Sequence, residues 1–257
     1  MSARTQLVAL YTLVRKECHR VFRIWLQTIL PPAITTALYF LIFGNIIGRR
    51  VGQMGGHDYV QFIAPGLIMM QVITNAYGNV VSSFFAAKMQ RHLEEMLVAP
   101  MATWAIVLGH TIGGVVRGLA VAAAVTAVAL FFTRLHVVHV LVTFSVIILT
   151  AFVFSLGGLI NAILAKNFDD VSIIPAFVLA PLSYLGGVFY SVELLPDFAR
   201  RLSLLNPILY MVNAFRYGML GVSDIDLGLA YAIIVGFAVV LFVACMIMIR
   251  RGTGIRT

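Results

Sequence analysis

The chain has 257 residues, of which 61% are hydrophobic and only 11% are charged, and its mean hydropathy is +0.99. A soluble domain carries about 25% charged residues, so this composition excludes soluble enzymes, disordered proteins and nucleic-acid-binding modules. The formal net charge is +8. Its basic residues gather at the ends of apolar blocks, which is typical of a membrane protein whose flanks meet anionic lipid.

Residues 4–25 predict an amphipathic helix ahead of the first span. Apolar residues recur there at three- and four-residue steps. The intervening cations are Arg15, Lys16, Arg20 and Arg23. Such a helix lies at the level of the lipid headgroups, with its cations on phosphate. Two interpretations stay open: a simple membrane anchor, and a lever joined to the first span.

Charge-free windows predict the membrane spans. Five windows contain no Asp, Glu, Lys or Arg, and a sixth is interrupted by Arg117 alone. One crossing needs ~20 apolar residues, so each window is long enough for one span. We expect an all-α integral membrane protein whose six transmembrane helices cover residues 26–47, 62–87, 104–131, 139–165, 171–191 and 228–249.

Arg117 is the one charge placed clearly inside a span. Insertion scales give a cost of about 2.5–3.5 kcal/mol for Arg at a helix centre, so we expect this side chain to face protein or water. One interpretation is a polar contact in a translocation path or at a helix interface. The other is snorkelling, helped by the small neighbours Gly113, Gly114 and Gly118 that let another helix approach.

The loop at 88–100 predicts a short two-faced helix. Met89, Leu93, Met96 and Leu97 recur at helical spacing, so one face is apolar and the other charged. Pro100 then ends the helix before the next span. A helix of this kind, held between two spans, can transmit a push from a soluble partner. A solvated connector is the alternative.

A seventh apolar stretch, Leu202–Phe215, has only 14 uncharged residues. That length is too short for a crossing, and Asn206-Pro207 breaks it midway. We expect a re-entrant or interfacial helix, with the helix start marked by Pro196 and Asp197.

Six spans put both termini on the same side of the membrane. The loops and tails on that side hold eleven Lys and Arg residues, against six on the other side, where Arg216 is one of the six. Because cytoplasmic loops carry the excess of cations, we expect both termini in the cytoplasm. A C-terminal reporter that is active only outside the cytoplasm would contradict this orientation.

The sequence lacks the motifs of catalysis and nucleotide binding. It contains no Gly-x-x-x-x-Gly-Lys-Ser/Thr loop, no His-Glu-x-x-His and no Gly-x-Ser-x-Gly elbow. Asp169-Asp170 are adjacent, so they diverge on a helix rather than converge on a metal. The two cysteines, Cys18 and Cys245, have no metal-binding spacing. We therefore expect no enzyme activity, metal or cofactor on this chain.

An ordered series of motifs carries a family resemblance over nearly the whole chain. The chain resembles the membrane-spanning subunit of an ABC-2 type ABC transporter. The motifs are Arg23-Ile-Trp-Leu-Gln27 with Pro31-Pro32, Phe62-Ile-Ala-Pro-Gly-Leu67, Glu94-Glu-Met-Leu-Val-Ala-Pro100, Asn167-Phe-Asp-Asp170, Leu185-Gly-Gly-Val-Phe-Tyr190, Leu194-Leu-Pro196, Asn206-Pro-Ile-Leu-Tyr210 and Arg216-Tyr-Gly218.

The resemblance implies a single transmembrane domain over residues 1–257. Its expected parts are a connecting helix at 1–25, spans one to five over 26–191 with a coupling helix at 88–100, an outer re-entrant segment at 192–226, and the sixth span with a cytoplasmic tail at 227–257. It also implies a homodimer in the bacterial inner membrane that binds two copies of a separate ATPase, which holds ATP and Mg²⁺.

The resemblance also implies roles for residues. The coupling residues would be Lys88, Arg91, Leu93, Glu94, Glu95, Leu97 and Pro100. The translocation path would include Asn75, Asn79, Phe84, Arg117, Ser183 and Tyr184. The outer gate would include Pro196, Asn206, Pro207, Tyr210 and Arg216.

Export of an amphiphilic, lipidic, glycan or drug-like substrate is the activity that the resemblance implies. The alternative is a secondary transporter or channel that works without an ATPase. Proteins of that kind usually carry acids or His at membrane depth, and the expected spans contain almost none.

Overall fold

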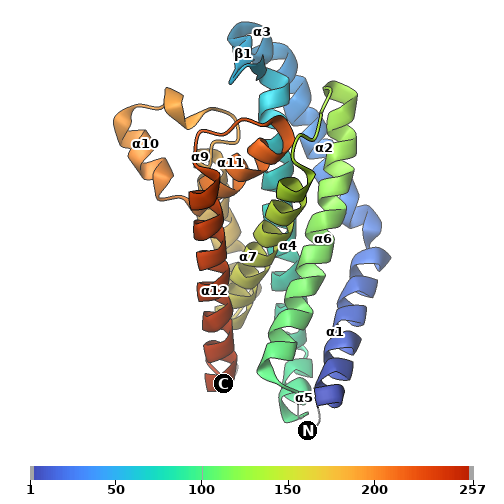
Figure 1. Ribbon diagram of the computed structural model, residues 1–257. Coiled ribbons are helices and arrows are strands. Elements are labelled where there is room, and N and C mark those ends of the chain that lie inside the picture. The colour runs from blue at the N-terminus through green and yellow to red at the C-terminus, as the bar shows by residue number, and fades with distance from the viewer. Residues whose placement is uncertain (1–2, 100, 255–257) are drawn as a thin grey trace.

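The computed structural model describes residues 3–99 and 101–254, apart from the side chains of Asn45, Arg49 and Leu97. This part of the chain is almost entirely helical (Figure 1). The two strands described there, β1 (Gln53–Met54) and β2 (His57–Asp58), form a two-residue antiparallel pair. The all-α architecture expected from the sequence is therefore present.

Fifteen helical segments follow one another along the described residues. They are α1 (Ala3–Arg23), α2 (Trp25–Tyr39), the π-helix η1 (Phe40–Ile47), α3 (Gly48–Val51), α4 (Tyr59–Met89), α5 (His92–Val98), α6 (Thr103–Phe132), α7 (Val140–Leu164), α8 (Phe168–Ile174), the π-helix η2 (Pro175–Leu179), α9 (Ala180–Leu185), the 3-10 helix η3 (Val192–Leu194), α10 (Asp197–Leu204), α11 (Pro207–Leu220) and α12 (Leu227–Arg251).

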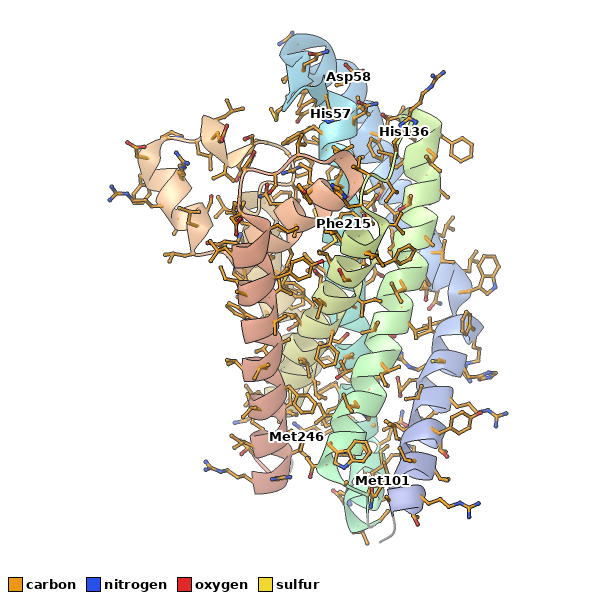
Figure 2. All side chains as sticks on the ribbon, viewed as in Figure 1. His57, Asp58, Met101, His136, Phe215 and Met246 are labelled. Carbon is orange, nitrogen blue, oxygen red and sulfur yellow. The ribbon has the colours of Figure 1, made fainter. Side chains whose placement is uncertain are left out.

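The helices form a bundle with two distinct ends. The start of α1, helix α5 and the end of α12 lie together at one end, which we call the α5 end (Figure 1). Strand β1, helix α3 and helix α10 lie at the opposite end, which we call the α10 end. Figure 2 shows Met101 and Met246 toward the α5 end, and His57 and His136 at the α10 end.

Five stretches among the described residues are helical, long and apolar enough to cross a membrane. They are Trp25–Gly44, Thr103–Phe132, Val140–Leu164, Phe168–Leu185 and Leu227–Arg251. Each overlaps one of the expected spans. The fifth expected span, 171–191, is shorter than predicted, because the helix ends at Leu185 and the chain turns at Gly186-Gly187, where Gly187 has a φ of +70°.

Helix α4 is the centre of the bundle. It covers the expected second span, is 31 residues long and packs against α6, α7 and α11. Most of its side chains are buried, including Gln71, Asn79 and Ser83. These polar residues lower its hydropathy below that of the five apolar helices. They are tolerated because other helices, rather than lipid, surround them.

Close helix packing around α4 depends on glycines of α6 and α7. A Cβ added at Gly158 of α7 would lie 2.5 Å from the carbonyl oxygen of Tyr77. A Cβ at Gly114 of α6 would collide with Ser155 Oγ and lie 2.7 Å from a Val80 methyl group. Small residues at such positions let backbones approach closely, which is how helices associate in membranes.

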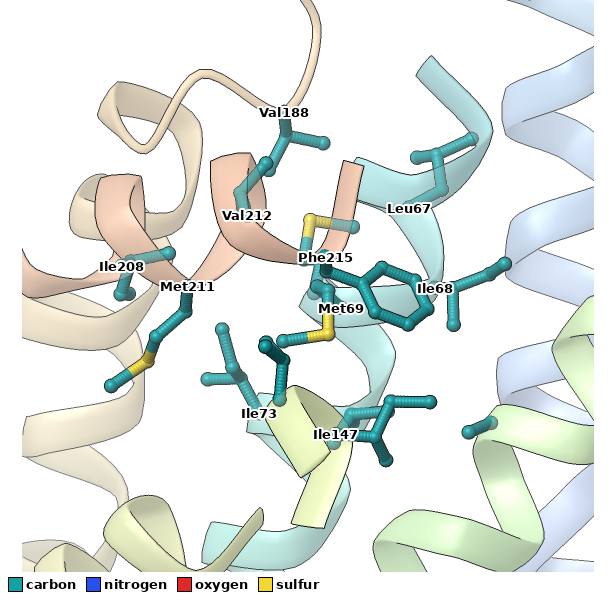
Figure 3. Close-up of a cluster of buried hydrophobic side chains, with 14 of the residues drawn as sticks. Leu67, Ile68, Met69, Ile73, Ile147, Val188, Ile208, Met211, Val212 and Phe215 are labelled. Carbon is teal, nitrogen blue, oxygen red and sulfur yellow. The ribbon is translucent and has the colours of Figure 1, made fainter. Parts of the chain in front are cut away.

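Helices α10 and α11 replace the expected single re-entrant helix at the α10 end. They meet at Asn206, so the break expected at Asn206-Pro207 is present. Helix α11 is largely buried, and its apolar side chains Met211 and Phe215 pack among Met69 and Ile73 of α4 (Figure 3). Helix α10 instead exposes Phe198, and Leu205, which directly follows α10, is exposed as well.

Candidate functional site

Helix α5 is the short two-faced helix at the α5 end. It covers His92–Val98, so the expected helix at 88–100 is wrong in its bounds: α4 continues to Met89 before the chain breaks. The break occurs at Arg91, whose φ of 61° is the one positive value among the described non-glycine residues. A left-handed residue cannot continue a right-handed helix.

The two faces of α5 differ as the sequence predicts. Leu93 is fully buried against Phe84 and Phe85 of α4 and Ile106 of α6. Glu94 and Glu95 are exposed, and their place in the first turn is stabilised by the positive end of the helix. The Leu97 side chain and Pro100 lie outside the described residues. The helix therefore anchors itself by one face and presents two carboxylates on the other.

Lys88, an expected coupling residue, lies in the last turn of α4 and contacts α7. Its Nζ donates hydrogen bonds to the carbonyl oxygens of Ile163 at 2.8 Å and Ala165 at 2.7 Å. These carbonyls belong to the end of α7, where they have no partner within the helix. Lys88 thus links α4 to α7, whereas Arg91 is exposed.

Helix α1 packs along the half of α6 that is nearest the α5 end (Figure 1). Gly109 and Gly113 of α6 make room for Leu13 and Glu17 of α1: a Cβ at Gly113 would lie 2.6 Å from Glu17 Cβ. The expected amphipathic helix is therefore present but has a second, buried face. Its exposed apolar residues are Leu7, Val8, Tyr11 and Phe22.

A polar cluster connects this buried face of α1 to α4. Glu17 is fully buried and accepts hydrogen bonds from Ser83 Oγ, at 2.7 Å to each carboxylate oxygen. Arg20 Nη2 donates to Glu17 Oε2 at 3.1 Å, and to the backbone oxygen and Oδ1 of Asn79 at 3.0 and 2.9 Å. The buried carboxylate is thus paired and hydrogen-bonded, as a charge away from water must be.

The Glu17 charge also affects the neighbouring thiol. Partial burial raises the pKa of Cys18, and the adjacent Glu17 carboxylate raises it further. Cys18 therefore stays protonated at neutral pH and is a poor nucleophile. Of the other α1 cations, Arg15, Lys16 and Arg23 are exposed.

Arg117 faces protein, as expected from the cost of exposing it to lipid. Its Nη2 donates to Asn75 Oδ1 of α4 at 3.4 Å. Asn75, Asn79 and Ser83 lie four residues apart on α4, so they follow one face of that helix. We call these three contacts to Arg117, Arg20 and Glu17 the polar ladder, which joins α4 to α6 and to α1.

The residues expected to line a translocation path are not gathered in one place. Asn79, Phe84 and Ser183 are buried within the single chain. Phe84 contacts the ring of His110 edge-on, with 5.2 Å between ring centroids. Tyr184 is 50% exposed on α9, and its hydroxyl lies 3.4 Å from that of Tyr39.

Helix α4 does have an exposed strip. Thr74 and Ser82 are exposed, and the half-buried Gly78 lies midway between them. A Cβ added at Gly78 would meet no atom within 4 Å. These three small residues, at helical spacing of four, form a strip of the central helix that another molecule can reach.

Asn206 and Tyr210 fix the junction of α10 and α11. Asn206 Oδ1 accepts a hydrogen bond from the backbone N–H of Ile208 and caps α11, with Pro207 in the first helical position. Its Nδ2 donates to the Leu182 carbonyl at 2.6 Å. Tyr210 Oη donates to the Leu204 carbonyl at 2.8 Å. Pro196, at the other end of α10, is exposed.

Arg216 is fully buried, although it was counted with the cations of the outer loops. Its guanidinium lies 4.0 Å from the centroid of the Phe62 ring and donates to the Gly187 carbonyl at 2.6 Å and Asn213 Oδ1 at 3.3 Å. The buried guanidinium is stabilised because carbonyl oxygens and an aromatic face replace the water that it loses. Arg216 thus holds the turn at Gly187 against α4 and α11.

Comparison with known proteins identifies the family. The ABC-2 type transporter family model matches residues 8–220. The chain belongs to the ABC-2 type transporter family. It is 54% identical over 250 residues to the inner membrane transport permease YadH of Escherichia coli K12, covering 97% of this chain and 98% of that protein. It is also 28% identical over 217 residues to nodulation protein J of Sinorhizobium fredii NGR234, covering 84% and 82%.

The sequence patterns do not assign a role to three polar residues of this ABC-2 family member: Glu17, Asn213 and Asp224. Asp224 Oδ2 accepts from Ser191 Oγ and Val192 N at 2.9 Å, and its own N–H donates to Asn213 Oδ1. Glu17 had a readable signal in the glycines Gly109 and Gly113, four residues apart on α6. Asp224 had none, because its partners are distant in sequence.

Proposed function

We propose that this ABC-2 family protein is the membrane-spanning subunit of an exporter that is driven by a separate ATPase. Two copies of the chain form the translocation path, and each binds one copy of the ATPase, which holds ATP and Mg²⁺. The chain itself is not an enzyme. The protein resides in the bacterial inner membrane, as the name of its E. coli relative suggests.

The observation that carries the proposal is the placement of α5. It lies between α4 and α6, at the same end as the start of α1 and the end of α12 (Figure 1). It is anchored by the buried Leu93 and presents the exposed Glu94 and Glu95. A soluble partner that pulls on this face acts directly on the central helix. We assign it as the coupling helix, with α1 as the connecting helix.

We propose six spans, with α4 as the second. At a rise of 1.5 Å per residue, its 31 residues extend over ~46 Å, more than the ~30 Å of the hydrocarbon core. Six crossings put both termini on the same side of the membrane, at the α5 end, and the excess of Lys and Arg on that side places it in the cytoplasm and the α10 end outside. Helices α10 and α11 then form the outer re-entrant segment, in which Arg216 and Asn206 support a gate.

We propose that the second copy packs against the exposed side of the Phe168–Leu185 span. Only 11% of that span is buried within the single chain, and it exposes Ile173, Phe177 and Tyr184. The strip of Thr74, Gly78 and Ser82 on α4 is the small, polar surface that such a dimer can enclose. We infer that this strip, rather than the buried Asn79 and Phe84, lines the path.

The substrate is proposed only as a class: an amphiphilic, lipidic, glycan or drug-like molecule that leaves the cytoplasm or the inner leaflet. ATP-driven closure of the two ATPase copies moves the α5 helices. The polar ladder transfers that movement from α1 and α4 to α6, because paired polar groups inside a bundle hold helices together.

Affinity purification tests the proposal. The tagged chain is purified from its native membrane after mild cross-linking, and the bound proteins are identified by mass spectrometry. We expect an ATP-binding protein in near-equal amount and ATP hydrolysis by the complex in lipid. Recovery of the chain without any ATP-binding protein, together with solute transport by the chain alone in liposomes, would overturn it.

A further inference from the structure

An apolar hollow opens between α6 and α7 at their α10 ends. Its volume is about 520 Å³, within the range of small-molecule pockets. Helix α6 contributes four small residues, Ala122, Ala123, Thr126 and Ala127, between the larger Leu119 and Leu130. Helix α7 contributes Val140, Phe144 and Ile148, and α11 covers the hollow with Phe215 and Met219. The hollow exists because the small residues of α6 are recessed between larger neighbours.

The edge of this hollow carries hydrogen-bond donors. A second hollow of about 70 Å³ shares Met219 with it and is lined by His57, Gln61, Arg134 and His136. Figure 2 shows His57 and His136 near each other at the α10 end. Asp58 adjoins His57 in sequence but lines neither hollow. Within the described residues, the Arg134 side chain has no ion-pair partner.

The donors are held by a fixed backbone. Gln61 Nε2 donates to the Arg134 carbonyl at 3.1 Å. The backbone N–H groups of Val138 and His139 donate to the carbonyls of Met219 and Gly218 at 3.3 and 2.8 Å. The loop at 133–139 is therefore tied to both α4 and α11, so the backbone that carries Arg134 and His136 has a fixed place beside the apolar hollow.

The second copy is proposed to pack against the Phe168–Leu185 span, and no residue of that span is among the described residues that line this hollow. Water is disfavoured because the hollow offers it too few polar partners. A flexible hydrocarbon chain fits, and it restores the dispersion contacts that an empty hollow would forfeit.

We propose that this hollow binds one acyl chain of an anionic phospholipid from the leaflet at the α10 end, with the lipid phosphate on Arg134 and His136. Arginine and neutral or charged imidazole both donate to phosphate oxygens. The lipid is anionic because the unpaired Arg134 favours a headgroup with net negative charge, and phosphatidylglycerol lacks the ammonium group that would oppose it. That this leaflet is the outer one rests on the proposed orientation of the chain. The lipid site itself does not depend on that orientation.

Filling the hollow tests the acyl-chain part of the proposal. Ala123 is exposed and lines the hollow, so Ala123→Phe adds a ring there without a clash in the core. Ala232→Phe is the matched control on the exposed face of α12. Native mass spectrometry of each purified protein with added phosphatidylglycerol measures the tightly bound lipid. We expect about tenfold weaker retention in A123F only. Equal retention in A123F and A232F would overturn the proposal.

Removing the cation tests the headgroup part. Equal amounts of phosphatidylglycerol and phosphatidylethanolamine with identical chains compete for the wild type, for R134Q and for R201Q, a control on the exposed face of α10. We expect the preference for phosphatidylglycerol to fall about tenfold in R134Q and to persist in R201Q. An unchanged preference in R134Q would overturn the proposal.

Wild-type protein gives a third measurement, which does not depend on the folding of a variant. A ligand that binds only the native state raises thermal stability by mass action. We expect phosphatidylglycerol to raise the melting temperature of the detergent-solubilised protein more than phosphatidylethanolamine does. Equal shifts with the two lipids would overturn the assignment of an anionic headgroup.

Discussion

At the residue scale, the buried Glu17 shows what a periodicity can and cannot predict. Its position among Arg15, Lys16 and Arg20 places it on the charged side of an amphipathic helix. In the structure it faces Ser83 of α4, in space left by Gly113 of α6. Periodicity describes one helix, whereas burial depends on which helix lies next to it. Arg117 was predictable, because the cost of exposing a charge to lipid holds whichever partner is present.

Replacing Glu17 tests the polar cluster. Glu17→Ala leaves Ser83 Oγ without its acceptor and removes the carboxylate partner of the half-buried Arg20, which keeps only Asn79, so we expect a loss of about 1–3 kcal/mol in stability. Lys16→Ala, at the exposed neighbour, is the control. The midpoint of thermal unfolding in lipid nanodiscs measures both. Equal stability of E17A and K16A would show that the cluster contributes nothing.

Replacement of glycine by alanine is expected to have different effects on stability at Gly158 and at Gly78. Gly158→Ala brings a Cβ to 2.5 Å from the Tyr77 carbonyl oxygen, so α4 and α7 must separate and we expect a loss of at least about 1 kcal/mol. Gly78→Ala meets open space and is expected to leave folding unchanged while impairing transport by the dimer. Thermal unfolding compares the two. Destabilisation by G78A, or tolerance of G158A, would contradict the packing described for α4.

At the element scale, the apolar windows predicted where helices form better than where they end. The break between α10 and α11 was predictable, because Pro207 cannot continue a preceding helix. The break before α5 was not, because Arg91 adopts a left-handed conformation that is uncommon for a side-chain-bearing residue. The end of the fifth span at Leu185 was hidden because residues 186–191 stay uncharged although the chain has left the helix.

Charge reversal on α5 tests its role as the coupling helix. Glu94→Lys with Glu95→Lys changes exposed side chains only, so we expect normal insertion and folding. Binding of the ATPase is expected to weaken at least about tenfold, because the double substitution reverses the charge that α5 presents at the proposed contact. Lys166→Glu, on the loop between α7 and α8, is the control. Quantitative co-purification measures the effect, and wild-type recovery of the ATPase with the double variant would contradict the role.

At the scale of the whole molecule, the sequence was enough to predict a helical membrane protein, the positions of its apolar spans and its family. It was not enough to predict how the other helices surround α4. The expected path residues Asn79 and Phe84 are buried because α1, α6 and α7 enclose that helix, an arrangement set by contacts between distant segments. Arg216 is buried for the same reason, so it is no longer one of the cations in the outer loops. The difference in cation number between the α5 end and the α10 end therefore grows, which strengthens the proposed orientation.

Photo-cross-linking from α5 identifies the protein that this helix contacts in the cell. A photoreactive amino acid replaces Val98, which is 86% exposed at the α5 end, or Phe198, which is 82% exposed at the α10 end. Cells are irradiated and the cross-linked proteins are identified by mass spectrometry. We expect position 98 to capture a cytoplasmic ATP-binding protein and position 198 not to capture one. Capture of periplasmic proteins from position 98, with no ATP-binding protein, would contradict it.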